Sequence, residues 1–200
     1  MHDEPRALTR SGAAELIGDE RALALESLSP RERARFGTEP APRREAFLAG
    51  RRLLRGLVGD VLGVEPAAVP LTATCPDCSR DPGRPTSAGT DLHVSLAHRA
   101  DAVVAVVARG ARVGIDLEQP STRVDDLAPL IPNPSLQRWT RIEAVLKADG
   151  RGLRVDPAAV VFEPVPGGEL ASVPGSPIRY LVREVDVVPG VRASVAIEQR

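Results

Sequence analysis

Two carboxylates stand two residues apart in a segment whose alternation is typical of a β-strand. From Val113 to Glu118, apolar residues alternate with Gly114, Asp116 and Glu118. Because side chains along a strand point alternately to its two faces, we expect both carboxylates on the face opposite the core. Two residues of a strand span about 6.6 Å, so the two carboxylates can share a hard cation. The alternative is an edge strand whose polar face is simply solvated.

A second pair of charged residues lies on a segment with helical periodicity. Between Trp139 and Lys147, Glu143 borders the apolar stripe, and Lys147 follows one turn later. The ordinary interpretation is a surface i,i+4 ion pair worth about 0.2–0.5 kcal/mol. Lys147 is, however, the single lysine among 26 basic residues, and arginine would serve such a pair equally well. Since lysine and arginine differ at a reacting centre, the choice points to a compact ammonium group that takes part in chemistry.

Periodicity and turn signals predict the elements that position these residues. Apolar residues at three-four spacing predict three helices, over Gly12–Leu28, Arg44–Leu62 and the segment that Asn133-Pro134 caps and Gly150 ends. Alternating or continuous apolar runs predict strands, at residues 92–97, 102–108, 112–118, 160–162, 178–188 and 191–197.

Irregular segments separate the predicted elements. An arginine-rich link spans 31–44, and residues 66–89 should form loops with one short strand. A third irregular segment, 120–134, is interrupted by prolines. Each half of the chain then consists of a helix followed by strands. This order predicts an α+β fold of two similar halves that meet along a seam.

Composition excludes several classes of function. The 200 residues can bury a core without disulfides, and a formal charge of −1 provides no basic surface for nucleic acid. No run approaches the roughly 20 apolar residues of a membrane span, and the acidic start, Met1–Glu4, is unlike a signal peptide. We therefore expect a cytoplasmic protein that binds neither nucleic acid nor membrane. Cys75 and Cys78 supply only half of a four-ligand zinc site, and we expect reduced thiols in a loop.

These residues resemble the motifs of a known family, the 4′-phosphopantetheinyl transferases in their larger single-chain form. The resemblance runs from about Ser29 to Ile197 and rests on the strings Val113–Glu118 and, 20 residues later, Trp139–Lys147. Three further features precede them in the expected order: an arginine-bearing helix over 43–55, Gly83-Arg84-Pro85 and Val94-Ser95-Leu96-Ala97-His98.

The resemblance implies an architecture as well as a motif set. The family has two pseudo-symmetric α/β halves in one chain, with the active site at the seam between them. By position, residues 1–110 would form the coenzyme A-binding half, and 111–200 would carry the metal and catalytic motifs. Two halves within one chain favour a monomer.

The resemblance also implies a transfer reaction. Family members move the phosphopantetheine arm of coenzyme A to a serine of an acyl or peptidyl carrier protein of fatty acid, polyketide or nonribosomal peptide synthesis. They release 3′,5′-ADP. By position, Asp116, Glu118 and Glu143 would hold Mg²⁺ against the pyrophosphate. Glu143 would deprotonate the carrier serine, and Lys147 would stabilise the departing phosphate. Contacts to coenzyme A would come from Lys147 and from five further residues, Arg43, Arg51, Arg84, Ser95 and His98.

Three departures from the family pattern leave a second interpretation open. Ala97 stands where a serine is usual, Ile142 stands where a basic residue is usual, and the connector 119–138 is shorter than expected. A degenerate homologue that binds a carrier protein or a nucleotide without transfer would fit these losses.

Several of the site residues also have ordinary explanations when they are taken singly. His98 can cap a strand, Arg43 and Arg51 can be solvated helix residues, and Gly83-Arg84-Pro85 can be a plain turn. A chance match by an unrelated α+β domain is the third interpretation.

Overall fold

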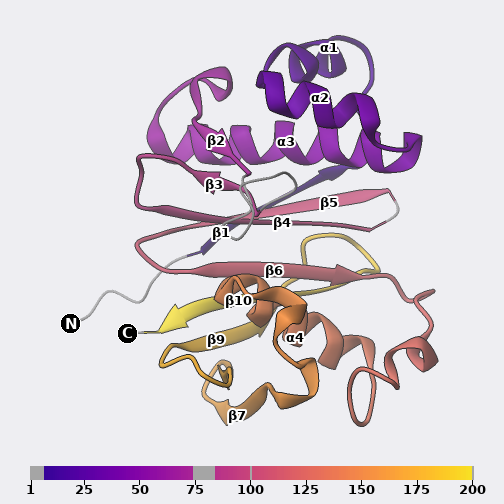
Figure 1. The fold of residues 1–200 in the computed structure, drawn as a ribbon, viewed down its shortest axis with the longest axis vertical. Helices are drawn as coiled ribbons and strands as arrows, with labels where there is room; N and C mark the ends of the chain where they lie inside the picture. Colours follow the sequence, from indigo (N-terminus) through magenta and orange to yellow (C-terminus); the bar gives the residue numbers. More distant parts are fainter. Residues whose placement is uncertain (1–6, 74–83, 100, 200) are drawn as a thin grey trace.

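Four layers of secondary structure make up the fold in the computed structural model, which describes residues 7–73, 84–99 and 101–199 (Figure 1). A long helix covers an antiparallel sheet of three strands, and a second helix covers an antiparallel sheet of five. The other faces of the two sheets pack against each other. The prediction of a mixed helix and sheet protein is therefore confirmed.

The first sheet is built around the continuous run of small apolar residues. Its strands in spatial order are β1 (Ala7–Ala13), β5 (Ala102–Arg109) and β4 (Leu92–Arg99). The helix α3 (Ala41–Leu62) packs on one face, where it contacts Ala105 and Val107 of β5. Val104 and Val106 point the other way, into the contact with the second sheet. Strand β5 is therefore buried on both faces, as its unbroken apolar sequence predicted.

The second sheet carries the strand with the two carboxylates. Its strands in spatial order are β6 (Val113–Glu118), β10 (Arg192–Gln199), β9 (Arg179–Glu184), β8 (Gly168–Ser172) and β7 (Val161–Val165). The helix α4 (Leu136–Asp149) lies across β6 and β10. Its apolar stripe, which includes Ile142 and Leu146, packs on Ala171, Tyr180 and Ala196 of this sheet.

The N-terminal region differs from its prediction in two respects. The helix expected over Gly12–Leu28 is shorter, α1 (Gly18–Glu26), and β1 precedes it. The prediction of an irregular, arginine-rich link over 31–44 is wrong, because a helix, α2 (Pro30–Thr38), occupies most of this segment. Ser29 and Glu32 form a reciprocal capping box that starts α2. Such a box adds about 1 kcal/mol to a helix start and outweighs the scarcity of apolar residues here.

The remaining differences concern the ends of elements and short pieces. Ser135, not Asn133-Pro134, caps α4, since its hydroxyl accepts a hydrogen bond from Arg138 N–H. Strand β8 was not expected. Short elements interrupt the irregular segments: 3₁₀ turns at Pro66–Ala68, Val124–Leu127, Gly152–Arg154 and Pro157–Ala159, and the paired strands β2 (Leu71–Thr72) and β3 (Thr86–Ser87).

Two further findings concern the limits of the described chain. Cys75, Cys78 and Gly83 lie outside the described residues. Among the residues that the structure describes, no helix is long and apolar enough to cross a membrane.

The two sheets meet along a seam between their edge strands β4 and β6. These strands lie side by side without a backbone ladder between them, so their outward backbone groups need other partners. Ser95 Oγ accepts a hydrogen bond from Ile115 N–H at 3.2 Å. The Arg84 guanidinium donates to Val94 O at 3.3 Å and to Val113 O at 2.9 Å. Side chains therefore hold the two sheets together here.

Candidate active site

Strand β6 carries Asp116 and Glu118 into the interior instead of onto an open face. All six of its residues are buried, and Asp116 and Glu118 are only 8% and 7% exposed. The helix α4 covers the face of β6 that carries the two carboxylates. It packs so closely that a Cβ on Gly114 would stand 2.0 Å from Ala144 O. The alternative of a solvated edge strand is therefore wrong.

The carboxylates of two elements open onto one cavity of about 570 Å³. Asp116 and Glu118 reach it from the end of β6, and Glu143 reaches it from α4. His98, near the end of β4, lines the same cavity, and residues 121–123, 126 and 127 of the connector form another wall. The structure therefore brings together four of the predicted site residues that lie up to 45 positions apart in the sequence.

Lys147 lies at the edge of this group and pairs with Asp116. Its Nζ stands 2.6 Å from Asp116 Oδ1, and its side chain is 30% exposed. Burial raises the pKa of Asp116, and the charge of Glu118 raises it further, while Lys147 pulls it back. The ammonium group is thus the main charge that opposes this rise in the pKa of Asp116.

Glu143 has the character of a proton acceptor. Burial raises the pKa of its carboxyl group above the ordinary value, and the nearby charges of Asp116 and Glu118 act in the same direction against Lys147. A carboxylate whose pKa is raised toward neutrality accepts a proton more readily, as a general base must. Two environments for neighbouring carboxylates, one paired with a lysine and one not, are typical of catalytic sites.

Glu118 is held by two residues that the sequence did not single out. Arg99 Nε stands 3.0 Å from Glu118 Oε2, and Thr122 Oγ1 donates a hydrogen bond to the same oxygen at 2.7 Å. Arg99 also donates to Thr122 Oγ1 at 3.2 Å. Arg99 directly follows His98 in β4, and neighbouring residues of a strand point to opposite faces. This alternation was the one signal in the sequence that Arg99 faces β6.

A group of cations surrounds His98 on the other side of β4. Partial burial lowers the pKa of the imidazole, and the charges of Lys147, Arg43 and Arg35 lower it further. Arg43 is exposed at the start of α3, and Arg35 on α2 stacks its guanidinium carbon 4.8 Å from the centre of the Phe47 ring. Such a concentration of positive charge with a neutral imidazole suits an anionic ligand that carries several phosphate oxygens.

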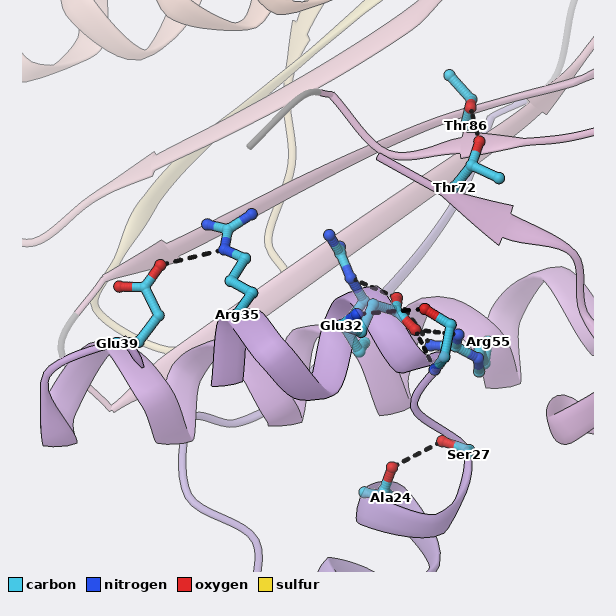
Figure 2. A network of polar contacts seen from close by, with 10 residues as sticks. Ala24, Ser27, Glu32, Arg35, Glu39, Arg55, Thr72 and Thr86 are labelled. Atoms are coloured by element: carbon cyan, nitrogen blue, oxygen red, sulfur yellow. Dashed lines mark hydrogen bonds and ion pairs between the residues drawn. The ribbon is translucent and has the colours of Figure 1, made fainter. Parts of the chain in front are cut away.

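Arg51 occupies a different environment from the one the sequence suggested. It is 3% exposed, and its Nε lies 2.9 Å from Glu32 Oε1. Arg55 reaches the other oxygen of the same carboxylate at 2.6 Å, as Figure 2 shows for Glu32 and Arg55. Burial alone would raise the pKa of Glu32, but hydrogen bonds from Arg55 and Ser29 N–H and the two guanidinium charges hold it below its usual range. Arg51 therefore joins α2 to α3 inside the fold.

Arg84 and Ser95 lie at the seam, where they bind backbone groups. Besides its bonds to β4 and β6, Arg84 donates to Ala148 O near the end of α4 at 3.3 Å. Both residues also line a second cavity of about 250 Å³, together with Leu96, Lys147 and Gly150. Lys147 thus borders this second cavity and pairs with a carboxylate of the first one.

The donor set fits a hard cation, although the side chains are not gathered around one point in this structure. Oxygen ligands of this kind are those that Mg²⁺ prefers, and the carboxylates of Asp116, Glu118 and Glu143 line one cavity, with Asp126 in its wall. Asp116 Oδ2 is buried and has no hydrogen-bond partner within the described part of the chain, which leaves a ligand atom for a cation. Among the described residues, however, no group of three His, Cys, Asp or Glu side chains is positioned to hold a metal ion. Asp116 Oδ1 is paired with Lys147, and Glu118 Oε2 is paired with Arg99.

Comparison with curated proteins finds a relative of nearly the whole chain. The chain is 28% identical over 213 residues to a protein named 4′-phosphopantetheinyl transferase HetI, from Nostoc sp.. The match covers 94% of this chain and 83% of that protein. It supports membership of the 4′-phosphopantetheinyl transferase superfamily. No family profile matches the chain.

The two residue-level departures from the family pattern lie in packed surroundings. Ile142 is fully buried in the core beneath α4, so a basic residue there could not stay ionised without a partner. Ala97 is 4% exposed and lies in the cluster between the two sheets. The apolar residues at these positions therefore contribute to the core.

Proposed function

We propose that this chain transfers the 4′-phosphopantetheine arm of coenzyme A to a serine of an acyl or peptidyl carrier protein and releases 3′,5′-ADP in a Mg²⁺-dependent reaction. The observation that carries the proposal is the convergence of Asp116, Glu118, Glu143 and His98 on one cavity, with Lys147 paired to Asp116 at its edge. The named relative, a 4′-phosphopantetheinyl transferase similar along nearly the whole chain, supports the same reaction.

Asp116, Glu118 and Glu143 would hold the metal ion. When bound, Mg²⁺ neutralises charge on the phosphate oxygens at which the reaction occurs. Glu143 would accept the proton of the carrier serine, directly or through a water molecule. Its raised pKa supports this role, since a stronger base takes the proton more easily.

Lys147 would stabilise the negative charge that develops on the departing nucleotide phosphate. An ammonium group that already stands beside a metal-site carboxylate and borders a second cavity lies close to any substrate that spans both cavities. A fixed positive charge in a partly buried site stabilises such a developing charge more strongly than it would in water.

His98, Arg43 and Arg35 would bind the nucleotide phosphates. The charges that act on His98 are all positive and come from Lys147, Arg43, Arg35 and Arg99, which supports an anion site around this residue. Residues 1–110 would then form the coenzyme A side and 111–200 the metal side. We do not assign Arg51 to coenzyme A, because it is buried against Glu32. Arg84 and Ser95 border the second cavity. Any contact that they make to the nucleotide would be additional to their hydrogen bonds at the seam between β4 and β6.

The decisive test is a transfer assay read by mass. The protein is incubated with coenzyme A, Mg²⁺ and a panel of apo carrier proteins from fatty acid, polyketide and nonribosomal peptide synthesis. We expect at least one carrier to gain the mass of the phosphopantetheine arm, and we expect chelation of the metal to stop the gain. If a transferase of known activity modifies the panel and this protein modifies none of it, the proposal is refuted.

A second candidate function is binding of a carrier protein or nucleotide without transfer. The observation that favours it is that Asp116 Oδ1 and Glu118 Oε2 already have protein partners in this structure. The same assay separates the two candidates when binding of 3′,5′-ADP is measured in parallel by calorimetry. Binding without a mass gain on any carrier would favour the second function.

A further inference from the structure

The face of β4 that runs along β6 carries a row of three side chains. Ser95 accepts the Ile115 N–H, Ala97 packs in the cluster between the sheets, and Arg99 reaches Glu118. The row follows from the two-residue period of a strand. Arg99 is therefore placed beside the carboxylate by the backbone of β4.

Two side chains, Arg99 and Thr122, converge on a single carboxylate oxygen, Glu118 Oε2. Arg99 Nε and Thr122 Oγ1 both contact it, at 3.0 and 2.7 Å, and they contact each other. Thr122 belongs to a turn after β6 in which its N–H donates to Gln119 O at 2.9 Å. These three contacts therefore join the end of β4, the end of β6 and the first turn of the connector at the carboxylate of Glu118.

The Arg99–Glu118 pair differs from an ordinary surface ion pair because one partner is buried. The Glu118 side chain is 9% exposed, whereas Arg99 is 46% exposed. A charge at the rim of a buried carboxylate group acts through a medium of lower dielectric constant than water. Two carboxylates of the cavity are thus each paired with a cation, Asp116 with Lys147 and Glu118 with Arg99.

We propose that Arg99 and Thr122 are positioning residues for Glu118, and that the charge of Arg99 weakens the binding of a divalent cation to the three carboxylates. This inference rests on the proposed function, which places a metal ion at Asp116, Glu118 and Glu143. The positive charge of Arg99 repels a second cation, and its guanidinium competes for Oε2. Thr122 adds no charge and restricts only where the carboxylate points.

The test measures metal binding directly, without coenzyme A or a carrier protein. Mn²⁺ is titrated into the purified full-length chain, and free Mn²⁺ is followed by electron paramagnetic resonance. We expect Arg99→Met to lower the Kd for Mn²⁺ about three- to ten-fold, because a nearby positive charge is removed. Arg99→Lys keeps the charge and should stay within about two-fold of the wild type. Arg99→Gln is a second neutral variant in case the methionine variant folds poorly.

Arg109→Met is a matched control for loss of an exposed arginine. Arg109 lies at the opposite end of the same pair of strands, is 55% exposed and pairs with Asp91. Because no cavity carboxylate contacts it, we expect its replacement to leave the Mn²⁺ Kd within about two-fold of the wild type.

The role of Thr122 is tested through kinetics and rescue. Thr122→Val removes the hydroxyl without changing charge, so the Mn²⁺ Kd should stay within about two-fold while kcat for arm transfer falls about five-fold at an unchanged KM for coenzyme A. Thr122→Ser keeps the hydroxyl and should restore kcat. A defect of packing alone would not be rescued in this way.

The outcomes separate this inference from the proposed function. Equal Mn²⁺ affinity in the wild type and both neutral Arg99 variants would overturn the role of Arg99 and leave the metal site standing. Absence of Mn²⁺ binding in every protein would overturn both the inference and the metal-dependent function. Tighter binding by Arg99→Met in a protein that transfers nothing would support the inference and refute the transfer reaction alone.

Discussion

Lys147 Nζ lies 2.6 Å from Asp116 Oδ1, so the single lysine of the chain joins the catalytic-motif helix α4 to the carboxylate strand β6. The pair stands between the two cavities, because Asp116 lines the larger one and Lys147 lines the smaller one. A substrate that occupied both cavities would pass directly over this ion pair.

Replacing Glu143 by glutamine should remove transfer activity without harming the fold. The amide cannot accept the serine proton, so kcat should fall by about 10²- to 10⁴-fold. The free energy of unfolding at neutral pH should be equal or higher, because the repulsion from Asp116 and Glu118 is relieved. Glu163→Gln, at an exposed carboxylate that pairs with Arg179, serves as the control and should retain full activity. Wild-type turnover in Glu143→Gln would contradict the proposed base.

The stability of the protein should depend on pH through Glu143. Because its folded pKa is raised above the unfolded value, the folded state binds more protons than the unfolded state in the window between the two. The contribution of Glu143 to stability is thus present at low pH and is lost as pH rises from about 4 through the folded pKa.

The measurement is urea unfolding of the wild type and Glu143→Gln across that pH range. We expect the free energy of unfolding of the wild type to fall more steeply with pH than that of the variant. The difference between the two proteins cancels the titration of groups they share, such as Glu32 and His98. Parallel curves would show that the carboxyl group titrates normally.

Glu32 should be one of the most sensitive positions for stability. Glu32→Gln removes the negative charge that Glu32 provides to the buried guanidinium groups of Arg51 and Arg55, and breaking a buried pair costs about 3–5 kcal/mol. Glu163→Gln breaks an exposed pair with Arg179 and should cost less than about 1 kcal/mol. Denaturant unfolding of the two variants measures both values. Similar small losses would mean that the buried pair contributes no more than a surface one.

Gly114 should tolerate no side chain. A Cβ there would stand 2.0 Å from Ala144 O and 2.5 Å from Ala148 N, so α4 would have to move away from β6. We expect Gly114→Ala to cost about 1–3 kcal/mol and to displace Glu143 and Lys147 relative to Asp116, with loss of activity. Gly37 in α2 has no atom within 4 Å of an added Cβ, and Gly37→Ala should be neutral or stabilising by up to about 1 kcal/mol. Equal thermal midpoints for the two variants would contradict the close packing.

Local patterns predicted the elements of the site well because each pattern depends on neighbouring residues. The period of two placed Asp116 and Glu118 together, and the three-four spacing placed Glu143 on the same helix edge as Lys147. The helix α2 was missed because its evident signal, the Ser29–Glu32 capping box, lies in a segment with almost no apolar stripe. Strand β1 was missed because it is an exposed edge strand, and exposed residues carry little periodicity.

Contacts between distant segments could not be predicted from those patterns. The alternation from Val113 to Glu118 predicted which face of the strand carries the carboxylates, but it gave no sign that the close approach of α4 buries that face. Arg51 was expected to bind coenzyme A, and nothing near it in the sequence showed that Glu32 would hold it in the interior. The same is true of Arg99 and Thr122, which meet only at Glu118.

The seam between β4 and β6 makes the amide hydrogen of Ile115 a specific probe of motion. A serine hydroxyl, not a carbonyl of a sheet ladder, holds that hydrogen. Its exchange with deuterated solvent therefore requires the two sheets to separate, but neither sheet has to lose its own backbone bonds. Exchange at this one amide distinguishes breathing between the sheets from unfolding of either sheet, and it measures that breathing beside the strand that carries Asp116.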